Sequence, residues 1–310
     1  MATNNFKSFG IGAGANVTSQ ADYEALAALL TGFQSGKASS AQINKALRQS
    51  STMAYVLAQF ISDSASVDVL DNGTPATILA NLKKGMTALT PGRLIGTQVF
   101  TSSGTYTPTP GTKKAIVRGV GGGGGGGGCP ATSGTQQSTA GGGQSGCYAE
   151  IILDTLQPSY NITVGTGGVA GTKAPTSGGG GGSTLIPGVL TIPGGTGGYA
   201  GAAVAPTISV GGVSNGTTLP TVITGTNRVL LPAAAGQPAL ILGSSTNQAK
   251  GGTGGSSPLG IGGQGGLGGA PGLAGVGFGA GGGGCSQLAG NAGDSGGTGS
   301  NGYLEIWEFA

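Results

Sequence analysis

Residues 113–128 read Lys-Lys-Ala-Ile-Val-Arg-Gly-Val, followed by eight consecutive glycines. The first half is typical of a short β-strand, and the second half has no side chains. The same junction recurs where residues 160–164 run into glycine-rich sequence, and in reverse where such sequence leads into residues 303–309. We therefore expect strands to hold the ends of glycine-rich segments, an arrangement that favours a rigid surface displaying loops over a catalytic pocket.

The composition combines the marks of disorder and of order. Glycine contributes 71 of the 310 residues and proline 15, which by itself is typical of low complexity or disorder. Disordered chains are also rich in charge and poor in apolar residues, whereas here charged residues are 7% and hydrophobic residues 37%. A chain with so few charges would aggregate if it remained unfolded. We therefore predict an ordered protein, and disorder is the alternative.

Several function classes are disfavoured by the residue content. The chain has no histidine, which is the commonest general base and metal ligand. The glycine run matches a dinucleotide fingerprint, but residues 129–134 start no helix, which that fingerprint requires. A net charge of +3 without basic clusters predicts no nucleic-acid partner, and the apolar stretches are too short for membrane insertion. We expect no enzyme activity, no cofactor and no metal site.

The three cysteines, Cys129, Cys147 and Cys285, are an odd number and lack metal-ligand spacing. Together with an N-terminus that shows no signal peptide, they indicate assembly in a reducing cytoplasm. Three buried thiols are the expected state, and a Cys129–Cys147 disulfide is the alternative.

The sequence divides into three regions. Residues 1–17 predict an extended arm, which is either a disordered terminus or a strap anchored on a partner by Phe6 and Phe9. Residues 18–90 predict helices. Residues 91–310 follow a Thr-Pro-Gly linker and predict strands and glycine-rich tracts.

Three helices are predicted in the helical region. The first begins after Ser19 with a capping-box-like Asp22, the second near Ser39, and the third at Thr74 with proline in its first turn. The second carries a long apolar stripe that includes Met53, Val56, Leu57 and Phe60. About 70 residues bury only a marginal core, so we predict an assembly module; the alternative is a self-sufficient three-helix domain.

The C-terminal region begins with an alternation over residues 97–107 that predicts a hairpin. Further strands are predicted over residues 113–120, 149–154, 160–164 and 303–309. The last of these mixes apolar and charged residues on both faces, which indicates partial cover on both sides, as in a small sandwich. Residues 183–250 are poorer in glycine and form either a β-rich cover or subunit contact, or a set of display loops.

Glycine recurs every third residue from Gly260 to Gly275 and again from Gly290 to Gly302. This is the period of an extended helix with three residues per turn, and its bare glycine edge lets backbones approach closely. A collagen triple helix needs far more proline than Pro271 alone, so a bundle of such helices from one chain is favoured. Its rim is expected to carry the apolar residues Leu259, Ile261, Leu267, Leu273, Val276 and Phe278.

Residues 100–108, Phe-Thr-Ser-Ser-Gly-Thr-Tyr-Thr-Pro, and residues 114–124 resemble the glycine-rich C-terminal domain of bacteriophage tail fibre proteins, as does the ending at 302–308. Residues 20–89 resemble the N-terminal region of such fibres from phages of Gram-negative hosts. The tracts are similar to the polyglycine-helix sandwiches of distal tail-fibre adhesins. The resemblance implies an α+β fold: an N-terminal α-helical attachment region, then a small β-sandwich-like domain carrying polyglycine-II helices.

The same resemblance implies a virion tail protein, assembled in the host cytoplasm, that binds a bacterial surface receptor: a polysaccharide, an outer-membrane protein or a pilus. Fibres of this kind are commonly homotrimers held to tail or baseplate proteins by their N-terminal part. The residues expected to attach or oligomerise are Phe6, Phe9, Met53, Val56, Leu57 and Phe60. The residues expected to contact the receptor are Tyr199, Asn215, Asn227, Arg228, Phe278 and Gln287.

Two other functions compete with receptor binding. One is a purely structural tail or baseplate connector, in which the glycine-rich domain only stiffens the assembly. The other is an ice-binding or cell-wall-type glycine-rich protein, against which the attachment-like helical half and the lack of a signal peptide argue.

Overall fold

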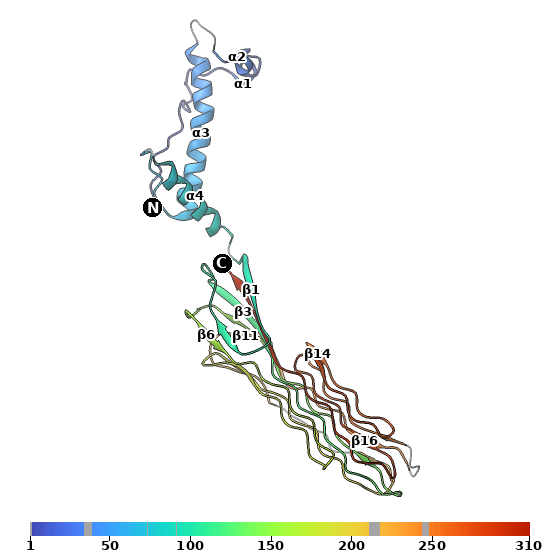
Figure 1. Cartoon of the computed structure of the whole chain (residues 1–310). Coiled ribbons are helices and arrows are strands. Elements are labelled where there is room, and N and C mark those ends of the chain that lie inside the picture. The colour runs from blue at the N-terminus through green and yellow to red at the C-terminus, as the bar shows by residue number, and fades with distance from the viewer. Residues whose placement is uncertain (1, 34–38, 73, 91, 211–217, 244–247) are drawn as a thin grey trace. The chain divides into compact units, whose positions relative to one another are not determined.

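The computed structural model describes residues 2–33, 39–72, 74–90, 92–210, 218–243 and 248–310. The chain forms two compact units, Met1–Pro91 and Gly92–Ala310. The first unit is helical, and the second contains the strands and the glycine tracts (Figure 1).

The described part of the N-terminal unit contains the helices α1 (Gln20–Glu24), α2 (Ala28–Thr31), α3 (Ser40–Ala65) and α4 (Pro75–Ala88). The second and third predicted helices are confirmed as α3 and α4. The first predicted helix is wrong as a single element, because residues 25–27 interrupt it. Neither α1 nor α2 buries a residue, so no packing stabilises a longer helix there.

A small core joins α3 to α4. Ala58, Ile61 and Val69 form its buried centre, and Ile78 and Leu82 of α4 pack against it. Ile61 is fully buried. The core is as modest as the length of this region predicts.

The N-terminal arm is extended and follows α3 in the opposite direction. The Asn44 side chain donates a hydrogen bond to the Asn16 carbonyl at 2.8 Å, and the Phe9 N–H donates to the Ser51 hydroxyl at 2.9 Å. Near its start the arm forms a parallel bridge with Val69. The arm is therefore ordered on its own unit, which corrects the alternative of a disordered terminus.

The C-terminal unit contains a five-stranded antiparallel sheet in the order β1-β17-β3-β5-β11. Its strands are β1 (Leu94–Phe100), β17 (Tyr303–Phe309), β3 (Lys114–Val120), β5 (Tyr148–Leu153) and β11 (Thr226–Leu231). The predicted hairpin over residues 97–107 is wrong. β17 takes the place beside β1, and β2 (Gly104–Tyr106) pairs instead with β6 (Tyr160–Ile162). The reason is burial, because Leu304 and Ile306 are fully buried when β17 lies inside the sheet.

The remaining strands are short. They are β7 (Thr184–Ile186), β8 (Leu190–Ile192) and β10 (Thr221–Val222) in one sheet, β9 (Ser209–Val210), β12 (Leu240–Ile241) and β13 (Ala249–Lys250) in another, and the pairs β14 (Gly260–Ile261) with β15 (Val276–Gly277) and β4 (Ser138–Thr139) with β16 (Ser286–Gln287). The glycine-poor region 183–250 thus supplies β8 to the core and β11 to the edge of the large sheet, so it acts in part as a cover.

The core of this unit contains side chains of the five-stranded sheet and of the smaller sheets. The large sheet contributes Val117, Ile151 and Ile306, and the smaller sheets contribute Ile162 and Leu190. Along β17 one face is buried and the other is half-buried. Partial burial was predicted for both faces of this strand, and the structure shows it for one face only.

Candidate functional site

Residues 121–128 form the centre of a bundle of glycine tracts that run side by side (Figure 1). The N–H groups of Gly121, Gly124 and Gly127 donate to the carbonyls of Cys147, Gln144 and Gly141 at 2.8–3.0 Å. The second residue of each triplet donates to the tract over residues 176–182, and the third to the tract over residues 294–300. The partner therefore changes with each residue and recurs at every third one, as in an extended helix with three residues per turn.

Three further tracts donate to the carbonyls of the same run. The N–H groups of Gly168, Gly195 and Gly282 bond to the carbonyls of Gly123, Gly122 and Gly124 at 2.8–2.9 Å. Six tracts thus surround residues 121–128, three antiparallel and three parallel to them. Residues 280–285 are enclosed in the same way by six tracts.

The space between these tracts excludes side chains. A Cβ added to Gly123 would lie 2.0 Å from the Ala280 carbonyl oxygen, and one added to Gly126 would lie 1.9 Å from the Gly283 carbonyl oxygen. Ordering a residue costs roughly 1–2 kcal/mol, and one hydrogen bond returns about 0.5–1.5 kcal/mol. Order in this run therefore depends on hydrogen bonds at both polar groups of each residue, and residues 122–128 each use both the N–H and the carbonyl.

The tracts end together at a loop surface, which we call the loop end. It consists of residues 130–136, 173–175, 267–271 and 288–293. The hydrogen bonds at the end of the central run show that these tracts end side by side. The Gly128 N–H donates to the Thr176 carbonyl at 3.0 Å, and the Cys129 N–H donates to the Asp294 carbonyl at 2.9 Å. Two of these loops are also bonded directly, since the Gly290 N–H donates to the Ser133 carbonyl at 2.9 Å.

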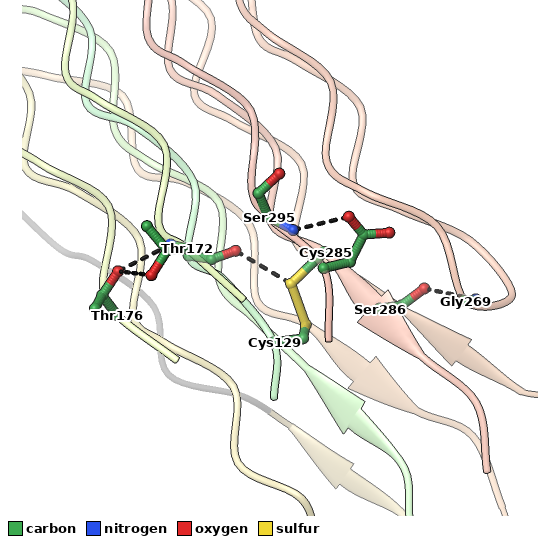
Figure 2. Close-up of a disulfide and its surroundings, with 9 residues drawn as sticks. Cys129, Thr172, Thr176, Gly269, Cys285, Ser286 and Ser295 are labelled. Carbon is green, nitrogen blue, oxygen red and sulfur yellow. Dashed lines mark hydrogen bonds between the residues drawn. A yellow bond between two sulfur atoms is a disulfide. The ribbon is translucent and has the colours of Figure 1, made fainter. Parts of the chain in front are cut away.

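A disulfide joins Cys129 and Cys285 at the loop end, with the two Cα atoms 5.9 Å apart (Figure 2). The two cysteines meet because their tracts run parallel and finish at the same level. Three free thiols and a Cys129–Cys147 pair were both wrong expectations. Cys147 lies at the opposite end of its tract, donates to the Thr218 carbonyl at 3.2 Å, and has its thiol pKa raised by burial.

The predicted receptor contacts are scattered over the unit. Tyr199 lies on a glycine tract with its side chain exposed, and Asn215 lies outside the described residues. Gln287 is a correction, because it is 2% exposed in a strand between tracts and cannot reach a ligand. Phe278 packs its ring against Tyr303, with centroids 4.7 Å apart, and is not at the loop end.

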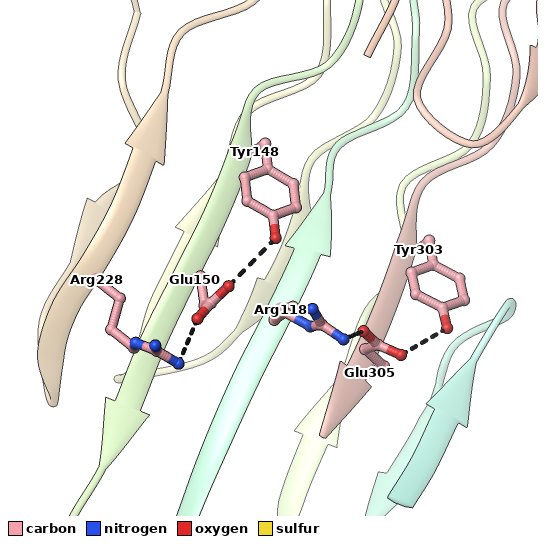
Figure 3. A network of polar contacts seen from close by, with 6 residues as sticks. All are labelled: Arg118, Tyr148, Glu150, Arg228, Tyr303 and Glu305. Carbon is pink, nitrogen blue, oxygen red and sulfur yellow. Dashed lines mark hydrogen bonds and ion pairs between the residues drawn. The ribbon is translucent and has the colours of Figure 1, made fainter. Parts of the chain in front are cut away.

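Asn227 and Arg228 are a further correction, since they lie in the edge strand β11 and not in a loop. The Arg228 guanidinium pairs with the Glu150 carboxylate at 2.6 Å (Figure 3). The next ion pair on the same sheet joins Arg118 to Glu305 at 2.5 Å. Arg228 is therefore engaged by its own sheet.

Two tyrosines complete this polar network (Figure 3). The Tyr303 hydroxyl donates to Glu305 at 3.1 Å, and the Tyr148 hydroxyl to Glu150 at 3.5 Å. Burial, and then the neighbouring carboxylates, raise the pKa of both hydroxyls. The two ion pairs of this network link neighbouring strands through their side chains, β3 with β17 and β5 with β11.

Glu308 is a structural residue that the strand pattern did not single out. It is fully buried, and its carboxylate accepts hydrogen bonds from the Tyr106 hydroxyl at 3.0 Å and from the N–H and hydroxyl of Thr109 at 2.8 and 2.7 Å. Burial acts to raise the pKa of Glu308, but these hydrogen bonds outweigh it and lower that pKa. The available signal was an acidic residue on the same face as Leu304 and Ile306.

The residues predicted for attachment include one exposed apolar face of α3. Met53, Val56, Leu57 and Phe60 are 68, 52, 48 and 38% exposed and share a face at i, i+3, i+4 and i+7 spacing. Phe9 is also exposed. Phe6 is a correction, since it packs against the core of its own unit and is not free to anchor a partner.

Metal ligation and membrane spanning find no candidate in the part of the chain that the structure describes. No three of its His, Cys, Asp and Glu residues are grouped so as to hold a metal ion. None of its helices combines the length and the apolar character that crossing a membrane requires.

Comparison with known proteins concerns the C-terminal unit. A family model described as a glycine-rich domain matches residues 99–305, which is more than half of the chain. The match contains β3, β5 and β11 of the large sheet, the tracts and the loop end, and it includes part of β1 and of β17. A search of curated proteins finds no match to the chain. By the extent of this family match, the chain belongs to the glycine-rich domain family.

Proposed function

We propose that the protein is a bacteriophage tail fibre protein that attaches the virion to a receptor on the bacterial surface. The observation that carries this proposal is the close-packed glycine bundle with loops gathered at one end. Binding residues are commonly found on loops that a rigid scaffold positions, and preorganised loops lose little conformational entropy when they bind. The resemblance of residues 100–124 and 302–308 to fibre domains supports the same function.

In this proposal the tracts are polyglycine-II helices, and the loop end contacts the receptor, which is a polysaccharide, an outer-membrane protein or a pilus. Thr135, Lys173 and Leu267 are exposed there, and Tyr199 is exposed on a tract beside it. A cation and an aliphatic side chain on separate loops, with an aromatic ring on the neighbouring tract, provide mixed contacts for such a surface.

The N-terminal unit docks on the tail or baseplate and associates as a homotrimer in the same proposal. Its support is the α3 face formed by Met53, Val56, Leu57 and Phe60, since contiguous exposed apolar patches mark interaction sites. Burial of this apolar face between subunits would stabilise the trimer by about 25 cal/mol per Å² of buried area. Measuring the mass of the assembled protein in solution tests the trimer.

A cell-binding experiment tests receptor recognition. Fluorescently labelled full-length protein is incubated with a panel of Gram-negative strains, and bound protein is measured by flow cytometry. Leu267→Ser, at the loop end, is compared with Val276→Ser, away from it; these side chains are 71 and 69% exposed, so the control is matched. We expect the first variant alone to lose binding. Failure of the intact protein to bind any strain that the intact virion infects would contradict the proposal.

The competing proposal is a structural connector without receptor contact. It is favoured by the internal engagement of Arg228 with Glu150 and by the burial of Gln287. Under this proposal, substitutions at Lys173 or Leu267 would leave virion adsorption unchanged.

A further inference from the structure

The N-terminal unit contains an open cavity of about 700 Å³ between the arm, α1 and α3. The residues that line it include Ile11, Gln20, Lys45, Arg48, Gln49 and Met53. Lys45 and Arg48 are three residues apart on α3 and therefore neighbours on the helix surface. The volume lies within the range of ligand-binding clefts, about 300–1,000 Å³.

Lys45 is the unusual member of this lining. The residue as a whole is only 5% exposed, because its stem is buried while its ammonium keeps contact with solvent at the cavity. Its ammonium lies 5.7 Å from the centre of the Tyr23 ring. Among the residues that the structure describes, the Lys45 ammonium has no hydrogen-bond partner and no ion-pair partner. The three ion pairs found among those residues all lie in the C-terminal unit.

The carboxylates of the adjacent helix α1 have other hydrogen-bond partners. Asp22 accepts a hydrogen bond from the Ser19 hydroxyl at 2.6 Å. Glu24 accepts one from the Gln20 side chain at 2.7 Å. The lining of the cavity thus contains two cations, and among the described residues neither carboxylate of α1 forms an ion pair with them.

We propose that this cavity binds an acidic peptide segment of the protein on which the N-terminal unit docks, with a carboxylate of that segment between Lys45 and Arg48. The side-chain amide of Gln49 lines the same cavity and offers a hydrogen-bond partner to the backbone of the segment. Ile11, which is 68% exposed, offers apolar surface to a neighbouring side chain of the segment. A small anion would use the cations alone, so the mixed lining favours a peptide. The identity of the partner as a tail or baseplate protein rests on the proposed function.

The test uses full-length protein and a fluorescein-labelled, amidated peptide of alternating glutamate and leucine, titrated by fluorescence anisotropy. The control peptide replaces each glutamate with glutamine. Lys45→Met with Arg48→Met removes both charges and keeps apolar stems, and Lys84→Met removes an exposed charge on α4. We expect the acidic peptide to bind at least about tenfold more tightly than its control, the double variant to lose that difference, Lys84→Met to retain it, and added salt to weaken binding.

Several outcomes would overturn the proposal: no saturable binding up to millimolar peptide, equal binding of the glutamine peptide, or unchanged binding by the double variant. Complete displacement by equimolar inorganic phosphate would show a small-anion site instead. A second measurement guards against misfolding: Lys45→Met gives up the contact with the Tyr23 ring, so the melting temperature should fall by at most about 8 °C, and a larger fall would reveal another structural partner for the charge. Cell binding by the double variant separates the two proposals, because it should be retained even where peptide binding is lost.

Discussion

Replacing Gly126 with alanine tests the close packing on which the proposed function depends. The new Cβ would lie 1.9 Å from the Gly283 carbonyl oxygen, whereas ordinary contact begins at 3.4 Å. Backbone must therefore move by about 1.5 Å, because no flexible side chain is there to yield. Such a shift breaks two hydrogen bonds of 2.8 Å, from the Gly126 N–H to the Gly297 carbonyl and from the Gly171 N–H to the Gly126 carbonyl.

The expected cost follows from these two bonds. Each buried group left unpaired costs about 1–3 kcal/mol, and alanine returns roughly 0.4–1 kcal/mol by restricting the unfolded chain. With one unpaired group for each of the two broken bonds, the free energy of unfolding should fall by about 1–5 kcal/mol. Gly180→Ala is the matched control, since its Cβ would meet only the Gly195 carbonyl oxygen at 3.6 Å; it should be neutral or slightly stabilising.

The assay is denaturant unfolding followed by tryptophan fluorescence. Trp307 is the only tryptophan of the sequence and lies in β17, so its signal reports on the C-terminal unit. The refuting result is an unfolding midpoint for Gly126→Ala equal to that of Gly180→Ala. It would mean that the tracts do not approach one another as closely as their hydrogen bonds require.

Three further predictions concern other parts of the chain. Reducing the Cys129–Cys285 disulfide, or replacing both cysteines with serine, should lower the unfolding midpoint, because the bridge closes a loop with a sequence separation of 156, worth up to about 5 kcal/mol of chain entropy. Folding lowers the pKa of Glu308, so its carboxylate stabilises the fold at pH values above the unfolded pKa of about 4.3. This contribution is lost as the pH falls through the lower pKa of the folded state. The Glu308→Gln variant should therefore lose less stability than the wild type when the pH is lowered. Leu57→Asp on the exposed α3 face should reduce the mass of the assembly in light scattering while Trp307 fluorescence stays unchanged.

Local patterns were sufficient for the parts of the fold that depend on neighbours in sequence. Alternation located β3, β5 and β17, and proline at the start of α4 marked its first turn correctly. The period of three in the glycines is the same period with which hydrogen-bond partners recur around residues 121–128. These features could be predicted because a strand face, a helix start and a three-residue turn are each set within a few residues.

Other features depend on which tract lies beside which, and the local sequence does not encode that. The regular run from Gly260 to Gly275 is one pattern but two antiparallel tracts, reversed at Gly268 and Gly269, whose φ angles are +66° and +89°. Glycine permits this reversal at no steric cost. Because Gly269 also belongs to the three-residue repeat, the turn cannot be recognised from the sequence pattern. The burial of Gln287 depends in the same way on tracts that are distant in sequence.

The two kinds of position also explain how such a domain could change its binding partner. In the central tract, each of residues 122–128 would bring an added Cβ within about 2 Å of backbone and uses both its polar groups, so substitutions there affect the whole bundle. At the loop end, exposed residues such as Thr135, Lys173 and Leu267 lie outside that lattice. Within the bundle, the positions on which stability depends carry no side chains, and the side chains available for recognition are those whose replacement costs the fold least. A bundle built in this way can exchange its loops without repacking a core.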